Sequence, residues 1–77
     1  MTFDEFVKIV RKNYDENLLA FSKERRDNYF NGEEAKEYIQ HEYTRGTNRF
    51  KNGEITEKVL REGIAPTVGY CLSMMCD

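Results

Sequence analysis

The 77-residue sequence contains no tryptophan, one proline, one histidine and two cysteines. A zinc site needs three or four ligands at short spacing, and the sequence has neither a Cys-x-x-Cys nor a His-x-x-x-His pair. On a helix, Cys71 and Cys76 would point roughly 140° apart, which disfavours a disulfide between them. We therefore expect no metal, no cofactor and reduced thiols.

Long apolar segments are also missing. Charged residues interrupt the first eight positions, so no signal peptide is visible. The longest uncharged stretch, residues 63–76, is shorter than the ~17 to 20 residues that cross a bilayer, and it contains Pro66 and Gly69. We expect a cytoplasmic protein without a membrane anchor.

Combinations of residues that could act together in catalysis are equally scarce. The only combination of a nucleophile with a base is Cys71 or Cys76 with His41, and no neighbouring residue prepares either thiol for reaction. Glu37 lies one turn before His41, which is typical of neighbours on a polar helix face. The five glycines are scattered and match no nucleotide-binding motif. We predict that the protein is not an enzyme.

The charges that are present are unevenly distributed. A third of the residues are charged, and only Asp77 of these follows Glu62. An uncharged C-terminal segment in such a chain must be buried, so we predict a core helix that begins at Pro66, with Ala65 extended before it. Ala65, Gly69 and Ser73 form a row of small residues that would let another helix approach closely, within the domain or in a homodimer.

The N-terminal segment has a clear helix signal. Thr2 and Glu5 match a capping box, so we expect a helix from Phe3. Its apolar stripe consists of Phe3, Phe6, Val7, Val10, Tyr14, Leu18 and Phe21. Residues 3–30 form one helix or two, and the continuous stripe favours one, with a bend near Asn13 to Asn17.

Three more segments complete the chain. Asn31 and Gly32 predict a turn, and Glu33 begins a second helix that we expect to end near Gly46. Residues 47–52 should form a loop, and residues 54–62 a short helix that Gly63 stops. We predict one all-α domain over residues 1–77, a bundle of three to four helices with the apolar C-terminal helix in its core.

Ten aromatic rings are many for a domain of this size. We assign six of them to the core: Phe3, Phe6, Tyr14, Phe21, Tyr38 and Tyr43. The others, with Met74, are candidates for a contact surface because aromatic residues and methionine are enriched at interfaces. Together with carboxylates of the second helix, the predicted partner-binding residues are Tyr29, Phe30, Glu33, Glu34, Glu37, Phe50, Tyr70 and Met74.

The sequence favours a small cytoplasmic protein-binding module, such as an inhibitor or adaptor of the kind that phages and mobile elements carry. An alternative is a nucleic-acid-binding domain that uses Arg45, Arg49, Phe50 and Lys51, although the formal net charge of −2 weakens it. A further alternative is a structural protein that self-associates through its C-terminal helix.

Overall fold

The computed structural model describes residues 1–76 and shows the predicted all-α bundle, with no strand in that range. Three separate helices come first, namely α1 (Phe3–Glu16), α2 (Lys23–Phe30) and α3 (Glu33–Lys51). The last helical segment is continuous and consists of α4 (Glu57–Val59), a π-helical turn (Leu60–Ile64) and α5 (Ala65–Met75). The molecule is elongated, measuring 40 × 21 × 18 Å.

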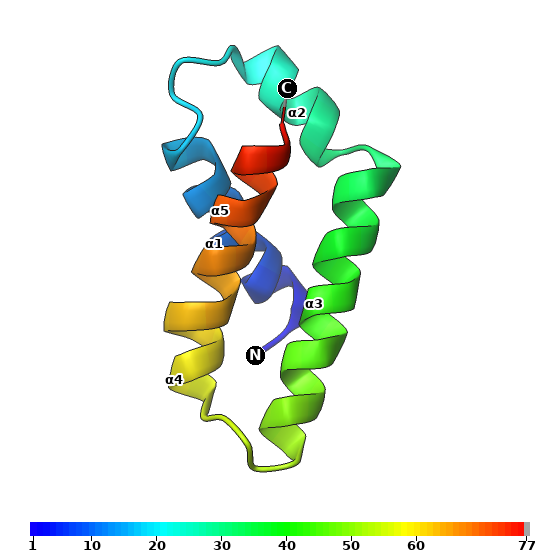
Figure 1. Ribbon diagram of the computed structural model, residues 1–77, viewed down its shortest axis with the longest axis vertical. Coiled ribbons are helices and arrows are strands. Elements are labelled where there is room, and N and C mark those ends of the chain that lie inside the picture. Colours follow the sequence, from blue (N-terminus) through cyan, green and yellow to red (C-terminus); the bar gives the residue numbers. More distant parts are fainter. Residues whose placement is uncertain (77) are drawn as a thin grey trace.

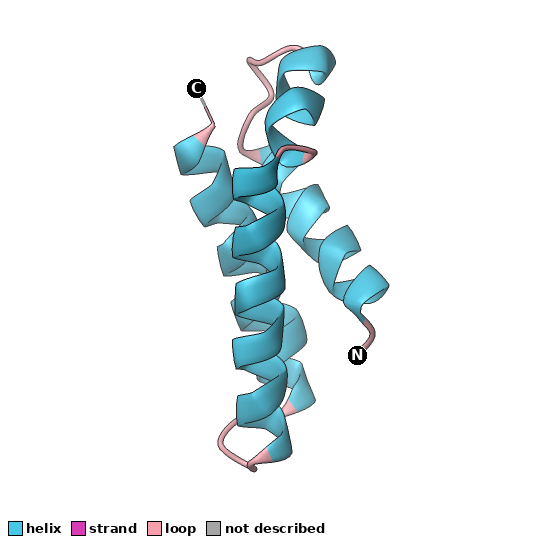
Figure 2. Cartoon of the chain, turned by 90° about the vertical axis from the view of Figure 1, so that its right-hand side faces the viewer, coloured by secondary structure: helices cyan, strands magenta, loops and turns pink. Residues whose placement is uncertain are grey.

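The two longest helical segments form the frame of the bundle. Figure 1 shows α3 running antiparallel to the α4–α5 segment, with α2 lying across one end of the pair. The shorter helix α1 lies behind the pair in Figure 1 and on one side of it in the turned view of Figure 2. Within residues 1–76, therefore, a helix covers one face of the α3–α5 pair and leaves the opposite face uncovered.

The predicted capping box is present at the start of α1. The Thr2 hydroxyl oxygen accepts from the Glu5 backbone N–H at 3.1 Å, and the Thr2 backbone N–H donates to the Glu5 carboxylate at 2.9 Å. The apolar stripe is confirmed at Phe6, Val10 and Tyr14, which are fully buried. Capping and amphipathicity thus place α1 as the sequence predicts.

Phe3 is less buried than expected. Its side chain is 37% exposed because it lies in the first turn of α1, at the edge of the core. One edge of the ring still packs against Tyr43, with the centroids 5.1 Å apart.

The preference for a single helix over residues 3–30 is wrong. Asn17 caps the end of α1, and α2 begins after Ser22, whose hydroxyl accepts from the Arg25 N–H at 3.2 Å. The intervening turn brings α2 back toward α1, so that the buried Tyr14 hydroxyl donates to the Arg26 carbonyl at 2.9 Å. Separate caps and this returning contact make two helices more favourable than one overhanging helix of ~42 Å.

The Arg11 side chain links α1 to α2. Its Nε lies 3.0 Å from the Asp15 carboxylate, a second guanidinium nitrogen pairs with Asp27, and the group stacks on the Phe30 ring at 4.8 Å. Hydrogen bonds from Lys23 and Arg11 lower the pKa of Asp27 from 3.8 to about 2. The ionised form of Asp27 therefore favours the folded state.

The predicted end of the second helix at Gly46 and the loop over residues 47–52 are also wrong. α3 continues to Lys51, and Gly46 is buried within it. A Cβ at this position would lie 2.7 Å from Leu60 Cδ1, so the glycine admits the neighbouring helix and does not end its own.

The predicted break between two helices at Gly63 and Ala65 is wrong, because both residues are helical. Thr56 caps α4 by accepting from the Val59 N–H at 3.2 Å, and Ala65 is helical, with φ −60° and ψ −47°. The Ala65 N–H donates to the Leu60 carbonyl, one residue further back than in an α-helix. This wider turn lets the helix continue into Pro66, which has no N–H to bond to the preceding turn.

The small-residue row of α5 packs as predicted, within the domain. Ala65, Gly69 and Ser73 are all buried, and α5 makes its most extensive interhelical contact with α1. A Cβ on Gly69 would lie 2.4 Å from the Val10 carbonyl oxygen and 2.8 Å from Asn13 Cβ. At the centre of the row, Gly69 therefore lies directly against the backbone of α1.

Candidate functional site

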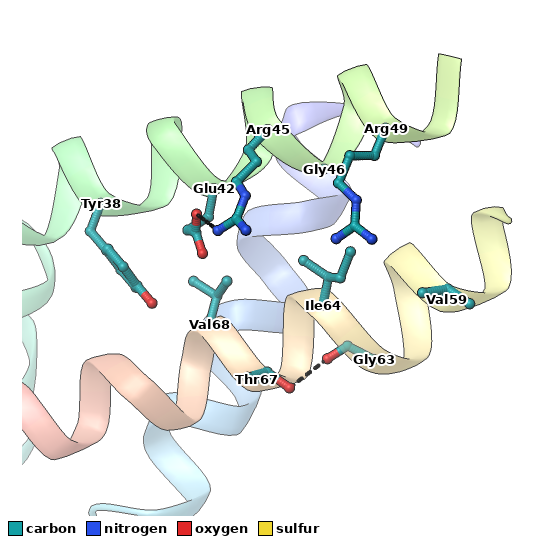
Figure 3. A pocket seen from close by; sticks show the side chains of 10 residues that line it. All are labelled: Tyr38, Glu42, Arg45, Gly46, Arg49, Val59, Gly63, Ile64, Thr67 and Val68. Carbon is teal, nitrogen blue, oxygen red and sulfur yellow. Dashed lines mark hydrogen bonds and ion pairs between the residues drawn. The ribbon is translucent and has the colours of Figure 1, made fainter. Parts of the chain in front are cut away.

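An open groove of about 310 Å³ lies between α3 and the α4–α5 segment, on the face of the pair that α1 does not cover (Figure 3). We call it the α3–α5 groove. Its lining residues are Tyr38, Glu42, Arg45, Gly46, Arg49, Val59, Gly63, Ile64, Thr67 and Val68.

The residues that α4, the π turn and α5 contribute to the groove lining are all uncharged. Val68 is buried at its base, Ile64 is half-buried, and Val59 is 45% exposed at one end. The Thr67 hydroxyl donates to the Gly63 carbonyl at 2.7 Å, so its proton is engaged within the helix. This wall therefore offers mainly apolar surface to a ligand.

The opposite wall carries the charge. Arg45 and Arg49 lie four residues apart on α3 and extend over the groove toward α5 in Figure 3. Arg45 lies 3.7 Å from the Glu42 carboxylate and remains 65% exposed, whereas Arg49 has no ion pair within residues 1–76. Two guanidinium groups thus face the groove against one carboxylate, which makes its rim locally positive.

Tyr38 stands at the other end of the α3 wall. Burial, together with a hydrogen bond to Cys71, raises the pKa of Tyr38 from 10.0 to about 12. The hydroxyl is therefore neutral at physiological pH. It adds a polar group to the groove without adding charge.

The groups considered for catalysis do not assemble here. Cys71 and Cys76 are free thiols, half-buried and buried, and within the described chain neither is hydrogen-bonded to His41. The His41 side chain is 73% exposed and lies 4.0 Å from Glu42. Residues 1–76 contain no group of three or more histidine, cysteine, aspartate or glutamate side chains arranged to hold a metal ion.

The predicted aromatic contact residues are dispersed. Phe30 is 8% exposed and packs on Tyr14, with ring centroids 5.1 Å apart, so the prediction that it forms a contact surface is wrong for the folded chain. Tyr29 is half-buried and stacks on Tyr14 at 6.5 Å. Tyr70 and Met74, in contrast, are 51% and 70% exposed on α5.

The predicted carboxylates lie at one end of α3. Glu33, Glu34 and Glu37 occupy its first turns and are exposed, whereas Phe50, 42% exposed, lies near its last residue. The helical rise over the seventeen residue steps from Glu33 to Phe50 is ~25 Å. Glu37 borders a second depression of about 480 Å³ between α1 and α3. These residues therefore cannot act as one small surface.

The basic residues predicted for nucleic-acid binding are partly brought together. Arg45 and Arg49 share the groove rim, whereas Phe50 and Lys51 lie outside its lining, in the last turn of α3. The opposite wall was not predicted from the sequence, because all of its α5 residues belong to the uncharged segment, which was expected to lie in the core. The length of that segment is a usable signal, since a helix without charges on any side exposes apolar surface wherever the bundle does not cover it.

Comparison with known proteins supplies no assignment. No protein-family model, curated protein or solved structure matches the chain. Among the helices of residues 1–76, none combines the length and apolar character needed to cross a membrane. The α3–α5 groove is therefore the feature on which a functional proposal rests.

Proposed function

We propose that this protein is a small, non-enzymatic, cytoplasmic binding module that holds a segment of a partner protein in the α3–α5 groove. The observation that supports the proposal is the uncovered face of the α3–α5 pair, where apolar surface and two arginines adjoin. Contact of this kind suits an inhibitor or adaptor such as those of phages and mobile elements.

The composition of the face agrees with a protein interface. Interfaces are enriched in aromatic residues, methionine and arginine, and their centres are poor in other charges. Tyr70 and Met74 follow Thr67 by three and seven residues, so they continue its side of α5 beyond the groove. Large exposed apolar side chains on a helix without charges typically mark a binding surface.

The proposal can be tested by filling the groove. Thr67 is exposed and lines the groove, so Thr67→Trp should occupy the binding space while leaving the core unchanged. Thr44→Trp is a matched control, because Thr44 is an exposed residue of α3 that lines neither depression. Both variants should retain the wild-type melting temperature.

Affinity purification from the native host, followed by mass spectrometry, provides the measurement. We expect a specific partner to co-purify with the wild type and with Thr44→Trp, and to be lost with Thr67→Trp. A partner that the Thr67→Trp protein retains in full, or the absence of any specific partner, would refute the proposal.

Nucleic-acid binding is the second candidate, and the position of its residues favours testing it. Arg45, Arg49, Phe50 and Lys51 fall within the last two turns of α3, where Phe50 is 42% exposed and free to stack on a base. Three phosphate contacts would give a slope of about −2 for log K against log salt on a single strand. Fluorescence anisotropy should show this slope reduced in Arg49→Ala; no binding at low salt rules the candidate out.

A further inference from the structure

The shape and charge of the α3–α5 groove also indicate the chemistry of the segment it would hold. We infer that the occupant is an amphipathic α-helix of a partner protein, with two carboxylates three or four residues apart beside an apolar stripe. This inference rests on the proposed function and adds to it the type of partner segment.

The walls of the groove favour a helix over an extended peptide. A strand gains affinity by pairing with free backbone groups at a sheet edge, but both walls here are helices whose backbone groups are bonded internally. The α3–α5 pair is covered by α1 on one face, so a helix on the other face would complete a four-helix arrangement. The groove thus offers a surface on which one more helix can pack.

The charges specify where acidic residues of that helix would lie. Arg45 and Arg49 are on successive turns of α3, where Cβ atoms four residues apart are separated by ~5 to 6 Å. Carboxylates at positions i and i+3 or i+4 of a neighbouring helix have the same spacing, and each can accept two hydrogen bonds from a guanidinium group. Arg49, which has no ion pair within residues 1–76, is available for such a contact.

The opposite wall specifies the apolar stripe. Val59 and Ile64 present methyl groups above the buried Val68, and from Gly63 to Met75 the helix carries no charge that could pair with a polar guest side chain. A helix with basic residues would instead place like charges beside Arg45 and Arg49. Charge complementarity therefore selects an acidic, amphipathic helix.

A displayed library of helical peptides, each about 20 residues long so that the helix is stable, tests this inference directly. The library is randomised on one face and selected against the full chain and against the double variant Arg45→Glu, Arg49→Glu. Peptides selected on the wild type should carry Asp or Glu pairs three or four residues apart, and those selected on the charge-reversed protein should carry Lys or Arg pairs. Arg45→Gln with Arg49→Gln serves as a second variant, because glutamate near the end of α3 opposes the helix dipole.

Affinity and mapping complete the experiment. Replacing both carboxylates of a selected peptide by amides should weaken binding roughly tenfold or more. Backbone NMR shifts should move at Arg49, Gly63 and Thr67. Affinity unchanged by the arginine substitutions, shifts confined to the depression around Val7 and Lys36, or no enriched helix at all would overturn the inference. If the native partner still depends on Thr67, those outcomes leave the proposed function standing.

Discussion

Gly69 is the position at which a single added methyl group should reveal how tightly the bundle is packed. In Gly69→Ala, the new Cβ would lie 2.4 Å from the Val10 carbonyl oxygen, 2.8 Å from Asn13 Cβ and 3.1 Å from the Tyr14 backbone nitrogen. Two of these atoms belong to the backbone of α1, which cannot rotate away as a side chain can. α1 and α5 must therefore move apart, which exposes part of the core between them.

Two opposing effects determine how much the unfolding free energy changes in Gly69→Ala. Overpacking of a well-packed core costs ~1 to 3 kcal/mol, whereas alanine is favoured over glycine within a helix by ~0.5 to 1 kcal/mol. Because the contact is with backbone, the upper part of the overpacking range applies, and we expect a net loss of about 1 to 2 kcal/mol of unfolding free energy. In a domain of this size, each kcal/mol lowers the melting temperature by ~4 to 8 °C. Gly69→Leu should prevent folding.

Two other glycines of the bundle serve as controls. A Cβ on Gly63 would meet no atom within 4 Å, so Gly63→Ala should raise the melting temperature through helix propensity alone. In Gly46→Ala the new Cβ would meet the flexible end of Leu60 at 2.7 Å, so its melting temperature should lie between those of Gly69→Ala and Gly63→Ala. Thermal unfolding followed by circular dichroism gives the order. A Gly69→Ala protein as stable as Gly63→Ala would refute the packing described for α1 and α5.

Three further predictions concern pH, capping and a buried hydroxyl. The pKa of Asp27 is about 2 in the folded protein against 3.8 ordinarily. Its contribution to stability is therefore present above about pH 4 and is lost as the pH falls through 2. Melting temperatures across this range should fall less in Asp27→Asn than in the wild type. Thr56→Ala removes the acceptor for the Val59 N–H and should cost ~0.5 to 2 kcal/mol in urea unfolding, and an unchanged midpoint would show that the cap is dispensable. Tyr14→Phe leaves the Arg26 carbonyl without its donor and should cost ~1 to 3 kcal/mol; a variant as stable as the wild type would mean that water replaces the hydroxyl.

Local signals in the chain predicted the elements whose causes are local. The capping box at Thr2 and the stripe through Phe6 and Val10 depend on residues within a few positions of one another, and α1 follows them. The small row at Gly69 was equally visible, and its close packing is observed. The candidate site was predicted only at Arg45 and Arg49.

Elements that depend on a distant partner were not predictable in the same way. Gly46 resembles a helix stop in sequence, yet it lies inside α3 because Leu60 approaches it from another helix. Phe30 lies outside the apolar stripe of α1, but the turn before α2 brings it onto Tyr14. Neither outcome can be derived from the residues beside it.

By itself, the sequence determined that this chain is a helical bundle with an uncharged C-terminal helix packed against the other helices, because caps, periodicity and the distribution of charge all act over short distances. Only the tertiary structure decided which side of that helix is buried. The π turn before Pro66 changes the direction of the side chains that follow, and the short α1 covers one face of the α3–α5 pair. The uncovered face is the one that carries Arg45, Arg49 and the groove.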